Sequence, residues 1–225
     1  MMTFQQRTQM PPVVLNLLIA NAVAFLATML IGRASIYELF ALFPVGSPFF
    51  HSWQVLTCGF LHGDFWHLFF NMFALWMFGR GLEIDLGSKR FLTYYIVCGV
   101  GASLMQLAMA EIDIMRMAEG SHLYWQYMCT PSVGASGSIF GLLLAFGMLH
   151  PNAVIMLLIP PIPMKAKWFV VVFGLAEVVF GISGRMDNVA HFAHVGGMLW
   201  GWLLLLWWRY RARRRYYNDN NDYNV

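Results

Sequence analysis

Charged residues are scarce in this chain. Only 11% of its 225 residues are Asp, Glu, Lys or Arg, whereas soluble domains carry about 25%. Hydrophobic residues make up 59%, and six long stretches lack charge almost entirely. Each stretch can cross or nearly cross a bilayer, which takes about 20 apolar residues per helix. The composition therefore excludes an ordinary soluble domain and predicts an all-α polytopic membrane protein.

Cysteine is also scarce, and Cys58, Cys98 and Cys129 do not have the spacing of a metal site. Cys58 and Cys129 fall on the same side of the expected topology, so a disulfide between them and three unrelated thiols both remain open. A small-residue cleavage site is lacking after the first apolar run. We therefore expect that run to be a retained helix rather than a signal peptide.

The apolar runs predict six transmembrane helices. Their expected bounds are 13–31, 64–82, 91–110, 132–150, 168–184 and 189–208. These bounds divide the chain into an N-terminal segment (1–12), a membrane domain (13–208) and a basic, then polar tail (209–225). The stretch AVIMLLIPPIP (153–163) is too short and too rich in proline to span. We interpret it as the exit of the fourth helix followed by an interfacial loop.

The distribution of basic residues predicts the orientation. With the N-terminus inside, the inner segments hold 11 of the 14 Lys and Arg residues. These are Arg7, Arg80, Lys89, Arg90, Lys165, Lys167, Arg209, Arg211, Arg213, Arg214 and Arg215. The positive-inside rule then places both termini in the cytoplasm, and we expect a bacterial inner membrane. The tail is interpreted as a stop-transfer cluster followed by a disordered end.

The segment between the first two helices (33–63) is rich in Phe, Leu, Trp and Pro. A solvated loop would be more polar. We therefore expect a first outer loop that is partly embedded in the membrane, with short amphipathic pieces near 35–42 and 52–61.

Four polar residues fall at one expected depth. At ~1.5 Å per residue, His67, Asn71, Ser136 and His194 lie roughly 5–12 Å below the outer surface, on helices that run in one direction. Polar side chains inside a bilayer are costly, so they should face the bundle interior. The pattern predicts a site that combines a hydroxyl, two imidazoles and an amide.

Small residues flank the serine and the histidine. Gly137 and Gly141 form one GxxxG pair and Gly197 and Gly201 another, and such pairs let two helices approach closely. If the two faces pack together, Ser136 and His194 meet at the upper end of the seam.

A serine that is hydrogen-bonded to a histidine is an activated nucleophile. Ser138 lies about 200° round the helix from Ser136, so we assign Ser136. Asp187 lies at the mouth and Glu177 about mid-membrane, so a Ser-His dyad is expected rather than a triad. Glu177 is interpreted either as a proton-relay residue or as a satisfied interior acid.

His67 and Asn71 are four residues apart and share a helix face. With the backbone N–H of Ser136, they are candidate donors to an oxyanion. Each of these features also has an ordinary structural explanation. A membrane serine often bonds its own backbone, glycine pairs can be ordinary packing, and Asn71 can join helices. His62 and His67 with His191 and His194 can instead form a metal or haem site.

Three motifs in combination resemble the rhomboid intramembrane serine proteases. They are H-x₄-H-x₃-N from His62 to Asn71, G-x-S-G from Gly134, and A-H-x-x-G-x-x-x-G ending at Gly201. IPPIPMKAKW (159–168) and most of 51–91 add to the likeness, which covers nearly the whole chain except its ends. The resemblance implies a six-helix bundle with a membrane-embedded first loop.

The resemblance also implies a role for each matching residue. Ser136 is the expected nucleophile and His194, not His191, the base. His67 and Asn71 are expected to support the oxyanion, and His62 to bond within the first loop. The supporting positions are Gly134, Gly137, Phe140, Gly197 and Gly201.

The chain departs from the family pattern at two positions. Gln54 follows Trp53 where members often have Arg, so the ion pair of that Arg is lost. Phe140 stands where some members have Tyr; its ring can still stack on His194 but offers no hydroxyl. Neither change removes a catalytic group.

The sequence therefore predicts an intramembrane serine endopeptidase that works through an acyl-enzyme. Its expected partners are transmembrane substrates and the lipid bilayer, with no cofactor, metal or nucleic acid; the oligomeric state is not specified. The alternatives are a catalytically silent protein that binds transmembrane helices, and a histidine-based haem or metal membrane protein.

Overall fold

A long helix, α2 (Pro12–Ile31), begins near the start of the described chain. The computed structural model describes residues 10–156, 161–183 and 190–221. Pro12 occupies the first helical position, where its missing N–H has no partner to lose. The free N–H groups of Val13 and Val14 donate to the buried carboxylate of Glu83, at 3.0 and 2.8 Å. A side chain 70 residues along the chain thus caps α2.

The predicted second span is helical from Phe65 to Leu86. It consists of α5 (Phe65–Ala74), a single π-helical turn η2 (Leu75–Gly79) and α6 (Arg80–Leu86). Asp64 caps its start, because its carboxylate accepts from the N–H of His67 at 2.9 Å. The sequence did not predict the π turn. Gly87, with φ 78°, then reverses the chain into α7 (Ser88–Ile114).

Short helices occupy the segment between α2 and α5. They are α3 (Arg33–Phe40), α4 (Gln54–Thr57) and the 3₁₀ turn η1 (Cys58–Phe60), close to the expected amphipathic pieces. The side chains of Ala41, Phe43 and Leu61 form a small core of their own. The segment is therefore packed rather than solvated, while its embedding in a membrane stays a prediction.

Gln54 holds this segment together. Its side chain is fully buried, and its Oε1 accepts from the N–H of His51 at 3.1 Å and of Phe43 at 3.4 Å. Its Nε2 donates to the carbonyls of Phe49 at 2.8 Å and Glu38 at 3.1 Å. A neutral amide thus satisfies four backbone groups, each of which would cost free energy if buried unpaired. The loop is stabilised without the ion pair that an Arg would make.

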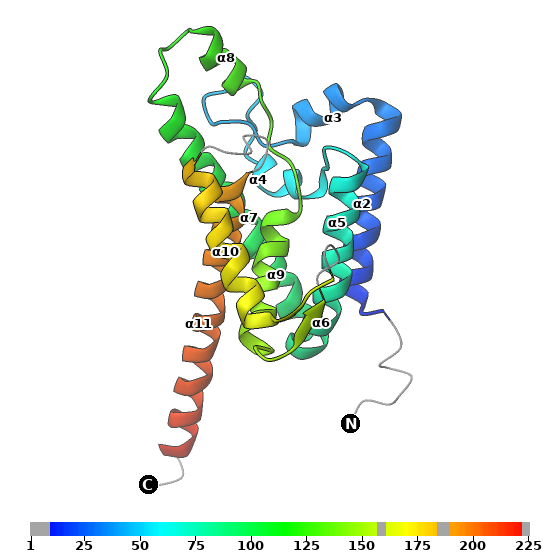
Figure 1. Ribbon diagram of the computed structural model, residues 1–225, viewed down its shortest axis with the longest axis vertical. Coiled ribbons are helices and arrows are strands. Elements are labelled where there is room, and N and C mark those ends of the chain that lie inside the picture. The colour runs from blue at the N-terminus through cyan, green and yellow to red at the C-terminus, as the bar shows by residue number, and fades with distance from the viewer. Residues whose placement is uncertain (1–9, 157–160, 184–189, 222–225) are drawn as a thin grey trace.

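Helix α9 (Ser136–Leu149) lies at the centre of the bundle. It packs against α7, α10 (Ala166–Ser183) and α11 (His191–Asn221), as Figure 1 shows. Eight of its 14 residues are buried. Because partners surround it, any polar side chain on α9 faces protein rather than lipid.

The chain before α9 is extended rather than helical. After α8 (His122–Met128), Ser132 pairs with Leu42 of the first loop through two backbone hydrogen bonds of 2.8 and 3.0 Å. The N–H of Gly134 donates to the carbonyl of Cys58 at 3.0 Å. The predicted helix start at residue 132 was therefore wrong by four residues, because these groups bond to the loop instead of continuing a helix. The start of α9 lies beneath the first loop.

Two further expectations need correction. The stretch 153–163, expected to be a loop, contains the strand β1 (Val154–Met156), which pairs antiparallel with β2 (Pro163–Lys165). Residues 157–160 lie outside the described residues. Helix α11 does not stop at residue 208 but continues through the basic cluster to Asn221. The expected segment 1–9, the ends of spans five and six (184 and 189) and residues 222–225 also fall outside the described residues.

The described helices include three that are long and apolar enough to cross a membrane: α2, α7 and α10. In α2 only 22% of the most apolar window is buried, and the outward side chains include Leu26, Met29 and Leu30. Such an apolar outer surface suits lipid and not water. The structure confirms a mostly helical membrane bundle. The count of six crossings stays a prediction.

All three cysteines are free. Cys58 is buried with its Sγ 3.3 Å from the hydroxyl of Ser103, whereas Cys129 is exposed. The alternative of three unrelated thiols is therefore confirmed over a Cys58–Cys129 disulfide.

Candidate active site

Ser136 and His194 meet in the interior of the bundle. Ser136 is the first residue of α9 and His194 the fourth of α11. The hydroxyl Oγ lies 2.7 Å from Nε2 of the imidazole, and His194 is only 7% exposed. The structure thus joins the two residues that the sequence had paired from their depth and from the glycine faces beside them. A hydroxyl hydrogen-bonded to an imidazole nitrogen is the arrangement of an activated serine.

Backbone contact between two helices makes this meeting possible. A Cβ at Gly197 would overlap the carbonyl group of Gly137, and one at Gly137 would collide with Ala102 of α7. Helices α9 and α11 therefore touch at backbone distance, as glycine pairs allow in membranes. The close approach brings the side chains next to it, Ser136 and His194, within hydrogen-bond reach.

The lower part of the seam differs from the expectation. Gly141 and Gly201 do not simply face each other, because Tyr94 of α7 lies between their helices. Its hydroxyl donates to the carbonyl of Gly141 at 2.9 Å and occupies the place that a Cβ of Gly201 would need. The glycines thus make a seam of three helices rather than two.

Ser138 is turned away from the site. Its buried hydroxyl donates to the backbone carbonyl of Tyr95 in α7 at 2.9 Å. The structure confirms that Ser136, not Ser138, faces His194.

Gly134 lies close to both His67 and the nucleophile. Its φ of 138° is one that L side chains rarely adopt. A Cβ there would lie 2.9 Å from Nε2 of His67 and 3.5 Å from Oγ of Ser136. Nδ1 of His67 accepts from the N–H of Gly63 at 3.3 Å, so in the neutral ring the proton is assigned to Nε2. An N–H donor and the serine oxygen thus both lie near the position of that Cβ.

Asn71 is buried on α5, one turn after His67. Its Nδ2 donates to the carbonyl of His67 at 2.9 Å, within its own helix. Among the described residues it makes no hydrogen bond to Ser136 or His194. One of its two N–H groups remains for another acceptor, and its role at an oxyanion stays a proposal.

Phe140 stacks on the base, as expected. Its ring lies 4.2 Å from that of His194, with 8° between the planes. The stack restricts rotation of the imidazole about its side-chain bonds. The stack uses the ring alone, so the missing hydroxyl of a Tyr leaves this contact unchanged.

Glu177 of α10 is the site residue that sequence reasoning misjudged. Its Oε2 lies 2.8 Å from Nδ1 of His194 and 2.6 Å from Nδ1 of His191. The sequence placed Glu177 about mid-membrane and therefore favoured a dyad, whereas the structure brings its carboxylate to His194. Helix rise gives backbone depth only, and the expected depths of Glu177 and His194 differed by roughly 3 Å, which a Glu side chain spans. That small difference was the available signal.

Glu177, His191 and His194 are also chemically able to hold a metal ion, since their donor atoms lie within 4.8 Å of one another. The 2.6 and 2.8 Å separations are hydrogen-bond distances, and two imidazole N–H groups satisfy the carboxylate. Two of the four histidines of the metal or haem alternative have other hydrogen-bond partners. His67 bonds Gly63 and His194 bonds Ser136. The geometry favours a hydrogen-bonded site.

His62 lies in the first loop, buried, with its ring edge-on to that of His67 at 5.0 Å. Its backbone carbonyl accepts from the hydroxyl of Tyr37 at 2.9 Å. This bond runs through the backbone of His62, so the structural role expected of its side chain stays a prediction.

We expect acid to destabilise the fold through His62. Burial lowers the pKa of His62 from 6.5 to about 4. The unfolded chain therefore binds the proton more readily, so the contribution is complete above pH 6.5 and falls as the pH drops towards 4. The loss approaches about 3 kcal/mol. Thermal unfolding in detergent from pH 7 to pH 4 should show a smaller loss of stability for His62→Gln than for wild type. Equal losses would contradict the prediction.

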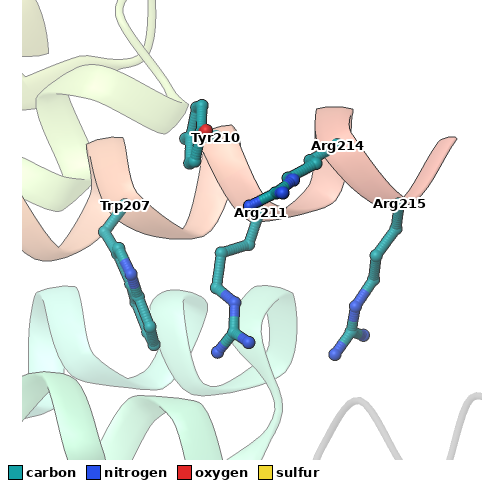
Figure 2. A pocket seen from close by; sticks show the side chains of 5 residues that line it. All are labelled: Trp207, Tyr210, Arg211, Arg214 and Arg215. Atoms are coloured by element: carbon teal, nitrogen blue, oxygen red, sulfur yellow. The ribbon is translucent and has the colours of Figure 1, made fainter. Parts of the chain in front are cut away.

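A shallow hollow at the basic end of α11 lies away from this site. Figure 2 shows its lining residues, which are Trp207, Tyr210, Arg211, Arg214 and Arg215. The guanidinium of Arg211 lies 4.9 Å from the ring centroid of Trp207. The lining contains none of the residues of the Ser136–His194 site, and four of its five side chains are Trp or Arg on the basic end of α11.

Comparison with known proteins agrees with the geometry. The model of the Rhomboid domain matches residues 50–211. Rhomboid protein 1, mitochondrial, of Saccharomyces cerevisiae is 34% identical over 155 residues, which are 67% of this chain and 41% of that protein. RHOMBOID-like protein 5 of Arabidopsis thaliana is 30% identical over 155 residues (68% and 44%). Rhomboid protease GluP of Bacillus subtilis is 30% identical over 154 residues (66% and 24%).

The chain spans less than half the length of these relatives. They include a mitochondrial and a plant protein, so they do not support the expected bacterial inner membrane over another one. The domain match, the apolar helices and the Ser136–His194 contact point the same way. The chain belongs to the rhomboid family and is an integral membrane protein.

Proposed function

We propose that the chain is an intramembrane serine endopeptidase that cleaves transmembrane segments of other membrane proteins. The observation that most directly supports the proposal is the 2.7 Å contact between Ser136 and His194, buried within the helix bundle of a rhomboid-family protein. One relative is named a rhomboid protease. The proposal includes six membrane crossings, with both termini in the cytoplasm, and a site open to water from the other side.

The contact supports acyl transfer in two steps. Nε2 of His194 takes the proton of Ser136 as Oγ attacks the scissile carbonyl carbon. The imidazolium then gives that proton to the leaving amine nitrogen, the C–N bond breaks, and an ester to Ser136 remains. Water repeats the sequence with His194 as base and releases the acid product.

The position that a Cβ of Gly134 would take is the proposed place of the oxyanion. His67 Nε2–H borders it, and the backbone N–H of Ser136 lies at a helix N-terminus, where its dipole favours negative charge. The second N–H of Asn71 is the proposed third donor. Preorganised donors of this kind act strongly where water is excluded.

The position of the site constrains the substrate. The first loop covers the start of α9 through the Leu42–Ser132 and Cys58–Gly134 contacts, so we propose entry from the bilayer, beside α10. A helical segment hides its carbonyls in hydrogen bonds, so it must unwind before attack. Helix-destabilising and small residues near the cleaved bond are therefore expected.

A fluorophosphonate probe tests the proposal. The detergent-purified protein should label covalently at Ser136, and Ser136→Ala should abolish the label. Ser138→Ala is the matched control, because that hydroxyl bonds Tyr95 instead of His194, and it should label normally. If the wild-type protein is not labelled, or if Ser136→Ala is still labelled, the proposed protease function is wrong. Either result would favour a catalytically silent protein that binds transmembrane helices. A Soret band or stoichiometric metal would favour the carrier alternative.

A further inference from the structure

A carboxylate lies behind the base, on a third helix. Ser136 comes from α9, His194 from α11 and Glu177 from α10. The contacts form one line, with 2.7 Å from Oγ to Nε2 and 2.8 Å from Nδ1 to Oε2. The side chains of His194 and Glu177 are 9% and 12% exposed. The two hydrogen bonds are thus shielded from water, where an ionic partner acts more strongly than at a surface.

We propose that Glu177 is a positioning residue that completes a Ser136–His194–Glu177 triad. The inference rests on the proposed protease function and changes its expected form from a dyad to a triad. Glu177 does not touch the reacting atoms in this arrangement. It acts through His194.

The carboxylate has two tasks. It accepts the Nδ1–H of His194, which leaves the lone pair of Nε2 directed at Ser136. It then stabilises the imidazolium that forms when Nε2 takes the serine proton. That proton passes to the leaving amine and never to Glu177, which stays ionised throughout.

His191 holds the carboxylate in place. Its Nδ1 donates to the same Oε2 at 2.6 Å, and its side chain is 7% exposed. Two donors on one helix, His191 and His194, thus fix one oxygen of Glu177. A carboxylate with two hydrogen bonds loses less conformational freedom when the imidazolium forms, because it is already oriented.

The triad depends on the position of α10. The buried residues of α10 are Ala166, Phe169 and Val170, all in its first two turns. Further along, Val179 and Ile182 are 60% and 75% exposed. Glu177 is therefore a polar contact in the half of the helix with the less buried apolar surface. The base is fully oriented only while this half of α10 lies against α11.

Glu177→Gln tests the triad, because it keeps the shape and removes the charge. We expect fluorophosphonate labelling and kcat for a model transmembrane peptide to fall by about 10²–10⁴-fold. KM should not change, because Glu177 does not contact the substrate. Glu177→Asp keeps the charge and should recover part of the rate.

The control is Val179→Ala on the outer face of the same helix, with the wild-type rate expected. Glu177→Gln that labels at the wild-type rate, or that changes KM alone, would overturn the triad while leaving the Ser136 protease intact. Wild type that does not label at all would overturn the proposed function itself. Stoichiometric zinc that is lost in Glu177→Gln would also overturn the triad. If Glu177→Gln does not fold, the kcat of Glu177→Asp decides: a reduced kcat supports the triad and a wild-type kcat refutes it.

Discussion

Replacing His194 with alanine is expected to lower the cleavage rate of a model transmembrane peptide by about 10⁴–10⁶-fold. The variant keeps Ser136 but has no group to take its proton, and a serine hydroxyl is a weak nucleophile without a base. The fold should persist, because the helix seam at this level is made by Gly137 and Gly197 and not by the imidazole. Single-turnover cleavage and thermal unfolding in the same detergent measure the two effects.

His150→Ala is the matched control. Its imidazole lies just after the C-terminal end of α9 and pairs with Asp85 at 2.6 Å, with both side chains more than a third exposed. An exposed pair of this kind contributes at most about 1 kcal/mol, so both activity and fold should be retained. Undiminished cleavage by His194→Ala would remove this residue from the mechanism.

Replacing Gly197 with valine is expected to have the largest effect on stability. A Cβ at this position overlaps the backbone carbonyl of Gly137, and backbone cannot move aside as a flexible side chain can. Helices α9 and α11 must separate, with an expected loss of more than about 3 kcal/mol. Because Ser136 adjoins Gly137, the separation also lengthens its contact with His194. A misplacement of about 1 Å is enough to slow catalysis ~100-fold.

Gly81→Ala provides the comparison within another helix. A Cβ at Gly81 of α6 meets no atom within 4 Å, and alanine is a better helix former than glycine. Its unfolding temperature should equal or exceed that of wild type. Thermal unfolding and fluorophosphonate labelling of the two variants separate the close approach from the general effect of replacing a glycine. Wild-type stability of Gly197→Val would mean that the helices do not touch there.

The pairing of Ser136 with His194 could be predicted because both lie near the start of a helix that runs in the same direction. Depth along an axis follows from counting residues at constant rise. The same count failed for Glu177, whose side chain, and not its backbone, reaches the level of His194. It also gave no information on Tyr94, since the rotation that turns α7 towards Gly201 depends on neighbouring helices.

Contacts between segments that are far apart in the chain could not be predicted from the sequence either. Glu83 caps α2 from 70 residues away, and Gln54 satisfies backbone groups on both sides of its loop. Helix α9 begins at Ser136 rather than at the predicted residue 132, because Ser132 pairs with Leu42. The pattern of residues along one segment carries no information about partners elsewhere in the chain. Each hydrogen bond forms because the folded chain brings a buried donor to a buried acceptor, which must be paired.

The sequence by itself determined that this is a helical membrane protein, and where its principal apolar helices lie. It also predicted that a hydroxyl, imidazoles and an amide lie at one depth. These properties depend on composition and on residue counts along single helices. Only the tertiary structure decided which faces meet: Gly137 against Gly197, Tyr94 in the seam, and Glu177 on His194. Rotation and lateral order of helices arise from packing between them, and one helix alone does not encode that packing.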